Sequence, residues 1–391
     1  MRIAIVGAGI AGPTLAWWLR RYGFEPVLYE LAPRLRKGGY VVDFWGVGYD
    51  VADRMGLKDE IHHRGYDFEK LLLVDARGKA SATLDLELFR SIAGGRFVSI
   101  ARSDLSSVIW EACSGIETHF GAEIESIEQD DTCVRLGLRS GETETFDLLV
   151  GADGLHSQVR KLVFGQDDQF EKQLGYYVAA FRDKGYASRD ELAYVAHCAP
   201  HRQVARFGLR NDETVFFFIF ASHLMDAEPL TEESQRRALL DVFSEMEWET
   251  PDILKRLQSS DGFYFDRVSQ IRMDHWTNHR VALVGDAAAC VSLLAGEGTG
   301  LAMTEAYVLA GELSTEADFT TAFQNYETRM RSFLRQKQES ARGTAGFFAP
   351  KSRVHMMIRN WSIRALKVPL LARLLVGRSF RDDFDLPGYA P

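Results

Sequence analysis

The amino-terminal segment is the feature that most constrains what this sequence can fold into. Residues Arg2 to Val6 form a short β-branched run, which predicts a buried strand, and a glycine-rich turn of sequence GAGIAG follows it. A helix-like segment from Pro13 to Tyr22 and a second predicted strand from Glu25 to Glu30 complete a strand–helix–strand unit. Such a unit has parallel strands and a right-handed crossover, which predicts an α/β fold with a Rossmann-like domain.

The turn matches the G-x-G-x-x-G pattern of dinucleotide-binding sites. Gly7 permits the tight turn, Gly9 lets the backbone approach a pyrophosphate, and Gly12 lets the helix pack closely on the strand. The amino terminus of the helix then offers N–H groups and a partial positive charge to phosphates. Glu30 ends the second strand, where a carboxylate binds ribose hydroxyls, so FAD or NAD fits better than NADP. A plain glycine turn is the alternative, but the strand, the helix and the acid all stand where dinucleotide binding requires them.

Two further glycine turns follow predicted strands. Residues 147–150 lead into Gly151-Ala152-Asp153-Gly154, which either places a carboxylate near a bound nucleotide or is an ordinary turn. Residues 280–284 end in Gly285-Asp286, and the loop then reaches residues 296–300 and a predicted helix. Glycines before a helix expose N–H groups that could face a flavin ring, and a helix start that serves only packing is the alternative.

Length and composition exclude several classes of protein. With 391 residues, 46% hydrophobic and 26% charged, the chain is expected to form two domains, or one domain with a second inserted in it. A net charge of -9 argues against nucleic acid as the main partner. The four cysteines form no CxxC pair, which predicts reduced thiols in a cytoplasmic protein and no metal site. We expect no signal peptide and no membrane span, since no stretch has the required pattern.

The middle of the chain predicts a different kind of structure. Residues 204–209 and 215–221 flank Asn211-Asp212-Glu213, a hairpin signal, so an antiparallel sheet is expected here. The last segment alternates apolar and basic residues, and we expect it to pack on the core and not to contact a membrane. The expected organisation is a dinucleotide-binding domain in two parts, 1–174 and 273–345, an inserted domain with an antiparallel sheet at 175–272, and a carboxyl-terminal helical tail at 346–391.

Taken in order, these motifs resemble those of the para-hydroxybenzoate hydroxylase-like flavoprotein monooxygenases, the group A aromatic hydroxylases. The resemblance spans residues 1 to about 310 and is nearest to the tetracycline-modifying and polyketide-tailoring branch. It implies FAD contacts from several parts of the chain: Gly7, Ala8, Gly9, Ile10, Ala11, Gly12 and Glu30 for the ADP half, Arg102 for the flavin side, Asp153 and Gly154 for both FAD and the reductant, Gly285 and Asp286 for the ribitol–pyrophosphate region, and Gly296, Gly298, Thr299, Gly300 and Leu301 for the isoalloxazine.

The sequence departs from the family in the loop after Gly285-Asp286. Family members often have one or two prolines there, whereas residues 287–295 contain none. The resemblance places this loop beside the reacting edge of the flavin. The absence of proline is therefore expected to affect the rigidity of this loop and the position of the substrate more than the binding of FAD.

The resemblance implies hydroxylation of an aromatic or polycyclic small molecule. NAD(P)H would bind transiently as co-substrate, since no second strand–GxGxxG–helix unit follows the first. Dioxygen (O2) would then form a flavin C4a-hydroperoxide, whose distal oxygen passes to the substrate. The alternatives are a flavin-dependent oxidase or reductase on the same fold, and an FAD-binding protein without turnover.

Candidate substrate residues come from the aromatic run VFFFIF at residues 215–220. Alternation divides this run into two faces, one with Phe216, Phe218 and Phe220 and the other with Val215, Phe217 and Ile219. One face could line a cavity, and burial of both faces in the core is the alternative. The candidates for substrate contact are Tyr177, Phe181, Phe216 and Phe218. No side chain is predicted to act as a catalytic base.

Overall fold

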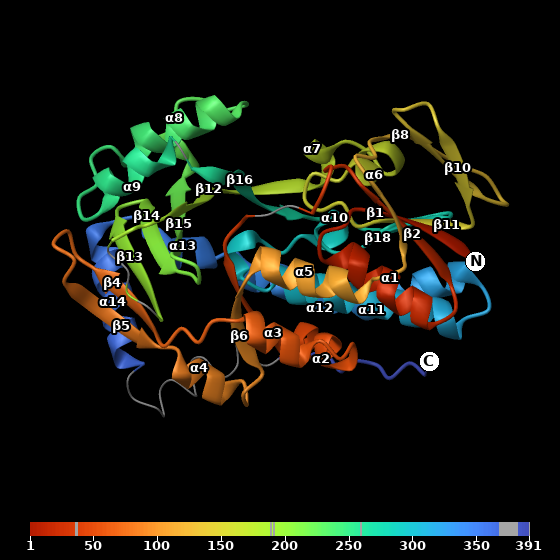
Figure 1. Ribbon diagram of the computed structural model, residues 1–391, viewed down its shortest axis with the longest axis horizontal. Coiled ribbons are helices and arrows are strands. Elements are labelled where there is room, and N and C mark those ends of the chain that lie inside the picture. The colour runs from red at the N-terminus through yellow and green to blue at the C-terminus, as the bar shows by residue number, and fades with distance from the viewer. Residues whose placement is uncertain (36–37, 188–189, 191, 259, 367–381, 391) are drawn as a thin grey trace.

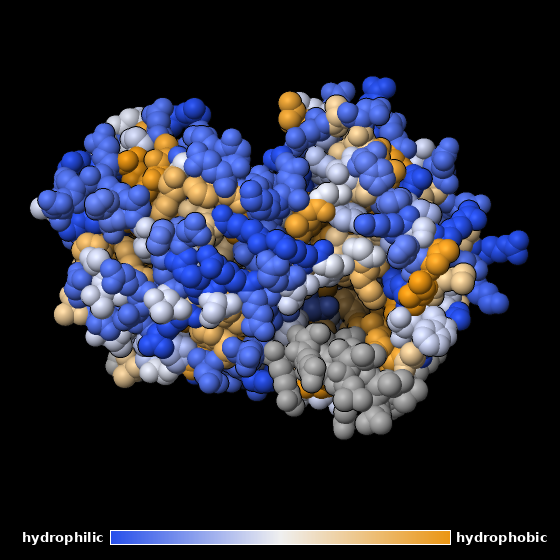
Figure 2. Space-filling view, turned by 180° about the vertical axis from the view of Figure 1, so that it is seen from behind, coloured by the Kyte–Doolittle hydropathy of each residue, from blue (hydrophilic) through white to orange (hydrophobic). Residues whose placement is uncertain are grey.

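The structure is a computed structural model, and it describes residues 1–35, 38–187, 190, 192–258, 260–366 and 382–390 (Figure 1). Two sheets organise the chain into two lobes, one mainly parallel and covered by helices, the other mainly antiparallel. Seen from behind, the surface is largely hydrophilic and a notch separates the lobes (Figure 2). The expected α/β class, a Rossmann-like domain combined with an antiparallel sheet, is confirmed.

The six-stranded sheet carries the nucleotide-binding motifs. Its order is β17-β18-β11-β1-β2-β7, and only β17 runs antiparallel to its neighbour. The strands are β1 (Arg2–Val6), β2 (Glu25–Glu30), β7 (Glu117–Phe120), β11 (Leu148–Gly151), β17 (Thr277–Asn278) and β18 (Val281–Leu283). Because β1, β11 and β18 lie side by side, the three glycine turns that follow them open at the same edge of the sheet.

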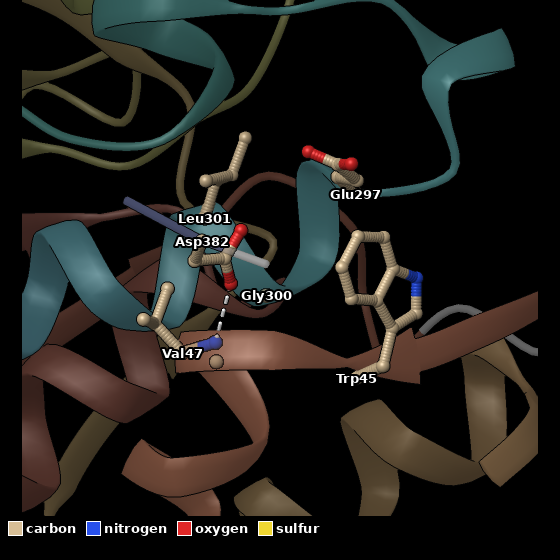
Figure 3. A pocket seen from close by; sticks show the side chains of 7 residues that line it. Trp45, Val47, Glu297, Gly300, Leu301 and Asp382 are labelled. Atoms are coloured by element: carbon tan, nitrogen blue, oxygen red, sulfur yellow. Dashed lines mark hydrogen bonds between the residues drawn. The ribbon is translucent and has the colours of Figure 1, made fainter. Parts of the chain in front are cut away.

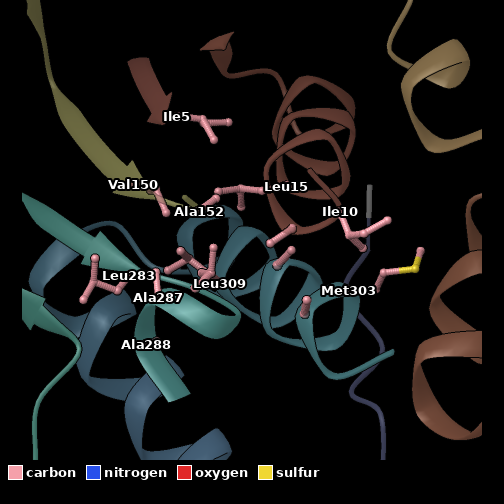
Figure 4. Close-up of a cluster of buried hydrophobic side chains, with 14 of the residues drawn as sticks. Ile5, Ile10, Leu15, Val150, Ala152, Leu283, Ala287, Ala288, Met303 and Leu309 are labelled. Carbon is pink, nitrogen blue, oxygen red and sulfur yellow. The ribbon is translucent and has the colours of Figure 1, made fainter. Parts of the chain in front are cut away.

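Helices pack on this sheet and bury its apolar residues. Ile5 of β1, Val150 of β11 and Leu283 of β18 pack in one cluster with Leu15 and Leu309 from two of the helices (Figure 4). These helices are α1 (Ala11–Arg21) and α11 (Gly298–Thr315), and α5 (Arg102–Ala112) and α12 (Phe319–Ala341) pack beside them. Nearly every residue of α11 is buried, which explains why its sequence is apolar on all sides.

The seven-stranded sheet forms the second lobe, and its order is β16-β12-β15-β14-β13-β4-β5. Its strands are β4 (Lys70–Val74), β5 (Ala80–Asp85), β12 (Glu171–Lys184), β13 (Ala193–Ala199), β14 (Arg202–Gly208), β15 (Glu213–Ala221) and β16 (Asp261–Ile271). The predicted hairpin is confirmed as β14 and β15, with Asn211 and Asp212 at φ 58° and 60°. The sheet also draws on residues 70–85, and the proposed division into domains stays a prediction.

The remaining elements connect and cover the two sheets. Short sheets are formed by β3 (Val41–Trp45) with β6 (Phe97–Ala101), and by β8 (Ile124–Gln129), β9 (Val134–Leu138) and β10 (Thr143–Phe146). The other helices are α2 (Gly46–Arg54), α3 (Lys58–Arg64), α4 (Glu87–Ile92), α6 (Gln158–Val163), α7 (Asp167–Phe170), α8 (Glu232–Phe243), α9 (Thr250–Leu257), α10 (Asp286–Ala289), α13 (Thr344–Phe348) and α14 (Arg353–Ala365), with 3₁₀ turns η1 (Ser222–Leu224) and η2 (Leu293–Ala295).

The carboxyl-terminal tail divides between the two lobes. Helix α14 lies against β5, and its Arg364 side chain donates to the carbonyl oxygen of Ser81. Residues 367–381 lie outside the described residues, and residues 382–390 lie against helices of the first lobe. Within the described part of the chain, no helix has both the length and the apolar character needed to span a bilayer.

Candidate active site

The three glycines of the GAGIAG turn have different surroundings. A Cβ on Gly7 would overlap the backbone of Ala152, and a Cβ on Gly12 would overlap the carbonyl oxygen of Gly7. A Cβ on Gly9 would have nothing within 4 Å. Gly7 and Gly12 are therefore needed for close packing, whereas Gly9 borders open space at the amino terminus of α1. Open space beside unpaired helix N–H groups is the arrangement that a pyrophosphate requires.

Glu30 lies directly against this turn. Its carboxylate accepts a hydrogen bond from the N–H of Ala8 at 2.8 Å and from the N–H of Ala32 at 2.9 Å. The Gly7 N–H donates to the carbonyl oxygen of Tyr29 at 2.7 Å. The end of β2 and the glycine turn are thus held together, and the predicted ribose-binding carboxylate stands beside the predicted pyrophosphate loop.

Asp153 of the GADG turn is held by the helix that follows it. Its carboxylate accepts from the Ser157 hydroxyl at 2.5 Å and from the N–H groups of Gln158 and Val159 at 2.7 and 3.0 Å. Burial raises the pKa of this carboxyl, and these hydrogen bonds oppose the shift. Gly154 has a φ of 79° and no neighbour that a Cβ would meet. The Asp153 carboxylate therefore caps α6, and its predicted contact with FAD and the reductant stays a prediction.

Arg160 connects the second and third glycine turns. Its guanidinium is fully buried and donates to the carbonyl oxygens of Ala287 and Leu155 at 3.0 and 2.7 Å. It also forms an ion pair with Asp167 at 2.6 Å. Arg160 lies six residues beyond the GADG turn, and the sequence did not indicate this role, because its three partners are carried by separate segments.

A buried carboxyl group that the sequence analysis missed lies beneath Gly285-Asp286. Glu305 of α11 accepts from the Gly285 N–H at 2.9 Å, and the Tyr326 hydroxyl lies 3.1 Å from the same carboxyl oxygen. Burial raises the pKa of Glu305 well above its ordinary value. A protonated Glu305 can donate to Tyr326, whose own proton then goes to the Leu283 carbonyl oxygen at 3.1 Å. The available signal was the presence of two acids, Glu305 and Glu312, in the apolar run after Gly300.

The start of α11 is packed tightly against α2. A Cβ on Gly48 would overlap the backbone of Gly300, so two glycine backbones cross in direct contact. Gly296, with a φ of 74°, precedes the helix, and Gly298 lies close to Asp286. The first N–H groups of a helix have no acceptor within it, which leaves those of Gly298 to Gly300 for a ligand, whereas the Leu301 N–H donates to the carbonyl oxygen of Glu297 at 3.1 Å. This helix start therefore lies beside the third glycine turn, as the isoalloxazine prediction requires.

The proline-free loop after Gly285-Asp286 contains a strained residue. Ser292 has a φ of 147°, a region that favours glycine, and it is 3% exposed. Its hydroxyl oxygen is buried and has no hydrogen-bond partner among the described residues. A strained backbone and an unpaired buried hydroxyl at one residue point to a ligand-contacting position.

Arg102 and Tyr40 bring the first lobe into contact with the antiparallel sheet. The Arg102 N–H donates to the Tyr40 carbonyl oxygen at 3.0 Å. The Tyr40 ring lies 5.6 Å from Phe217 and 5.9 Å from Tyr264, both carried by the sheet. Burial raises the pKa of Asp286, which the charge of Arg102 partly offsets, so these groups share one buried region. The loops that would hold a flavin therefore meet an aromatic face of the sheet.

The four predicted substrate residues lie on the opposite face of the sheet. Tyr177, Phe181, Phe216 and Phe218 are 8%, 0%, 0% and 0% exposed, and they pack beneath α8 and α9. These positions fit the alternative in which the four side chains are buried in the core, and they do not fit a role in lining a substrate cavity. The physical reason is that α8 and α9 cover this face, which leaves Phe217 on the face turned toward Tyr40.

His156, which follows the GADG turn, is paired with Asp266 of β16. Its Nε2 atom lies 3.0 and 3.1 Å from the two carboxylate oxygens, and its side chain is 50% exposed. The hydrogen bond to Asp266 raises the pKa of His156, burial opposes this shift, and the charges of Glu171 and Arg267 act in opposite directions. The pair connects the first lobe to the antiparallel sheet.

This pair gives a stability that depends on pH. A histidine with a raised pKa stabilises the fold at pH values below its ordinary pKa of 6.5, and this contribution is lost as the pH rises through the folded-state pKa. We expect His156→Gln to unfold at a lower temperature than wild type in acid and at the same temperature in alkali. The free-energy difference should stay below about 1 kcal/mol, because solvent screens the half-exposed His156 side chain. Melting curves against pH, with the exposed His63→Gln as control, measure it; an equal loss at every pH would contradict it.

No group of three or more metal-ligating side chains stands close enough to hold a metal ion within the described ranges. The glycine turns and helix starts described above are the positions at which a cofactor is expected. Their roles toward FAD stay predictions, residue by residue.

Comparison with known proteins identifies the family. A family described as "FAD binding domain" matches residues 1–336. A flavin-dependent monooxygenase of Legionella longbeachae is 34% identical over 343 residues, covering 87% of each chain. The crystal structure of tetracycline destructase Tet(55) is similar with a TM-score of 0.86 and 31% identity, covering 99% of this chain and 98% of that one. That of Tet(51) has a TM-score of 0.84 and 33% identity, covering 99% of both. The chain therefore belongs to this FAD-binding family and is a flavin-dependent monooxygenase, an oxidoreductase.

Proposed function

We propose that this enzyme uses NAD(P)H and dioxygen to hydroxylate an aromatic or polycyclic small molecule. The observation that carries the proposal is the meeting of the cofactor loops with an aromatic face. Tyr40, beside Arg102, lies against Phe217 and Tyr264 of the antiparallel sheet. Flat rings stack favourably on such side chains, whereas an aliphatic or strongly charged substrate gains less from them.

The residues present fit FAD on two structural grounds. The open space beside Gly9 can accept a pyrophosphate, and Glu30 stands beside it for the ribose hydroxyls. The unpaired hydroxyl of Ser292 is available in the loop beside α11. Gly9, Glu30, Arg102, Asp286 and the helix start at Gly298 would hold the cofactor from its adenosine end to its ring.

The chemistry needs few protein side chains. When bound, FAD would take a hydride from NAD(P)H and deliver its electrons to dioxygen, so that one oxygen atom enters the substrate and the other leaves as water. The aromatic face of Tyr40, Phe217 and Tyr264 would orient the substrate and exclude water. Burial raises the pKa of Tyr40 to about 12 and that of Tyr264 well above its ordinary value. Both phenols therefore stay protonated at neutral pH and can donate hydrogen bonds, but neither serves as a base.

Tetracyclines are the first substrates to test, because two structural neighbours are tetracycline destructases. We expect the purified protein to be yellow, to lose its visible flavin bands with anaerobic NADPH or NADH, and to recover them in air. With a productive tetracycline or phenol, one atom from labelled dioxygen should appear in the product by mass spectrometry.

Two results would overturn the proposal in different ways. A colourless protein that takes up no added FAD would contradict the cofactor assignment. A protein that reduces its flavin with NAD(P)H but returns all of the consumed oxygen as peroxide, with every ring tested, would be an oxidase instead. The matched variant Phe217→Ala should lower substrate affinity and leave FAD affinity unchanged, whereas Phe218→Ala, beneath α8 and α9, should only lower stability.

A further inference from the structure

Residues 382–390, here called the terminal strap, lie across the helices of the first lobe. Asp382 accepts a hydrogen bond from the Val47 N–H at the start of α2 at 2.7 Å (Figure 3). A Cβ on Gly46, whose φ is 70°, would overlap the same carboxylate. The backbone of α2 is thus shaped to receive the Asp382 side chain at its amino terminus, where a negative charge is stabilising.

Asp382 is also one end of a buried row of three charges. Lys337 of α12 lies 2.7 Å from Asp382 and 2.7 Å from Glu297, and the three side chains are 12%, 8% and 19% exposed. Burial alone would lower the pKa of Lys337, but the two carboxylates raise it. The ammonium group also lies 5.3 Å from the Trp45 ring. With all three groups charged, the row carries a net charge of -1.

This row stands at the start of α11. Glu297 immediately precedes that helix, and Gly300 touches Gly48 of α2. The small hollow between the two helix starts has room for about one water molecule. Its lining consists of Trp45, Val47, Gly48, Glu297, Gly300, Leu301 and Asp382 (Figure 3). Asp382 and Glu297 therefore border the segment that is proposed to hold the flavin ring.

The rest of the strap is fixed independently of Asp382. The Phe384 ring stacks on Phe333 at 4.9 Å, and the Pro387 carbonyl oxygen accepts from the Tyr307 hydroxyl at 2.7 Å. The ring of Tyr389 occupies the space left by Gly311, where a Cβ would overlap it. Loss of the Asp382 charge should therefore leave the strap in place.

We infer that Asp382 is a positioning residue for the flavin ring: with Lys337 and Glu297 it sets the charge beside the start of α11, and thereby the reduction potential of bound FAD. The inference rests on the proposed function, since it requires FAD at Gly298 to Leu301. Reduction places negative charge on the pyrimidine edge of the ring, so a nearby negative charge disfavours the reduced form. Asp382→Asn changes the row to 0 and Lys337→Met changes it to -2.

The two variants are therefore expected to act in opposite directions. In Asp382→Asn, the ratio of the affinity for reduced FAD to the affinity for oxidised FAD should be about tenfold higher than in wild type. This corresponds to a rise of roughly 30 mV in the two-electron reduction potential. Lys337→Met should lower the potential by a similar amount. The double variant, which restores a charge of -1, should return to the wild-type value. Asp385→Asn, with the same charge change at an exposed position of the strap, should have no effect.

The measurement is the midpoint potential of the FAD-loaded protein, by anaerobic equilibration with a reference dye, together with the dissociation constant of oxidised FAD. Opposite shifts support the inference. Shifts of the same sign, or values equal to those of Asp385→Asn, overturn it, because a purely structural role would move both variants alike. If Asp382→Asn does not fold, Lys337→Met is compared with wild type and Asp385→Asn: a lower potential supports the inference, and an unchanged or higher potential overturns it. Failure of the wild type to take up FAD would instead refute the proposed function.

Discussion

Gly9→Val is expected to lower the affinity for FAD by about 100-fold, roughly 2.8 kcal/mol, without lowering the stability of the apoprotein. The backbone of Gly9 has no positive φ, and a Cβ there would meet no atom within 4 Å. The added side chain therefore fits the protein alone, but it fills the space proposed for the pyrophosphate. Titration of the apoprotein with FAD, followed by flavin fluorescence, measures the affinity, and thermal melting measures the stability.

Gly12→Ala is the matched control and should behave in the opposite way. A Cβ at Gly12 would overlap the carbonyl oxygen of Gly7, so helix α1 would have to move away from β1. Such overpacking costs about 1–3 kcal/mol of stability or more. If Gly9→Val bound FAD as tightly as wild type, the pyrophosphate would have to lie elsewhere, and the glycine turn would serve only packing.

The fold of the first lobe could be predicted because its determinants are local in sequence. Gly7 and Gly12, whose small size the packing requires, lie within six residues of each other in the sequence. Glu30, which contacts the same turn, is separated from it in sequence by little more than one helix. The pairing of β4 with β13 could not be predicted in this way. It joins residues 70–74 to residues 193–197, and no local pattern specifies a partner so far along the chain.

The substrate face shows a different limit of the sequence. Alternation separated Phe216 and Phe218 from Phe217, but both sets are apolar and aromatic, so the pattern could not tell which set helices would cover. The packing of α8 and α9 decides this, and those helices cover Phe216 and Phe218. The charged row at Lys337 was equally hidden, because Glu297 and Asp382 meet only after the chain has crossed both lobes.

Arg160→Leu is expected to lower the free energy of unfolding by about 2–4 kcal/mol, because it removes a buried donor from two carbonyl oxygens and one of the two cations that pair with Asp167. The substitution would leave Asp167 paired with Lys161 at 2.9 Å, and it would remove the donor that Arg160 supplies to the carbonyl oxygens of Ala287 and Leu155. The exposed Arg139→Leu is the control. Its partner Glu123 is 44% exposed and Arg139 is 68% exposed, so the cost should be below about 1 kcal/mol.

Urea unfolding measures the stability of Arg160→Leu, of Arg139→Leu and of the double variant Arg160→Leu with Asp167→Leu. The comparison separates the contribution of the Asp167 ion pair from that of the carbonyl oxygens that Arg160 binds. If the Asp167 carboxylate, whose remaining partner is Lys161 at 2.9 Å, causes most of the loss, the double variant should recover part of it, since two apolar groups can replace an ion pair at little cost. If the carbonyl oxygens cause it, the double variant should be no more stable than Arg160→Leu. Arg160→Leu with the stability of Arg139→Leu would contradict both explanations. Since Ala287 belongs to the loop that follows Asp286, loss of its Arg160 contact should also weaken FAD binding, which connects the stability of this buried arginine to the cofactor site.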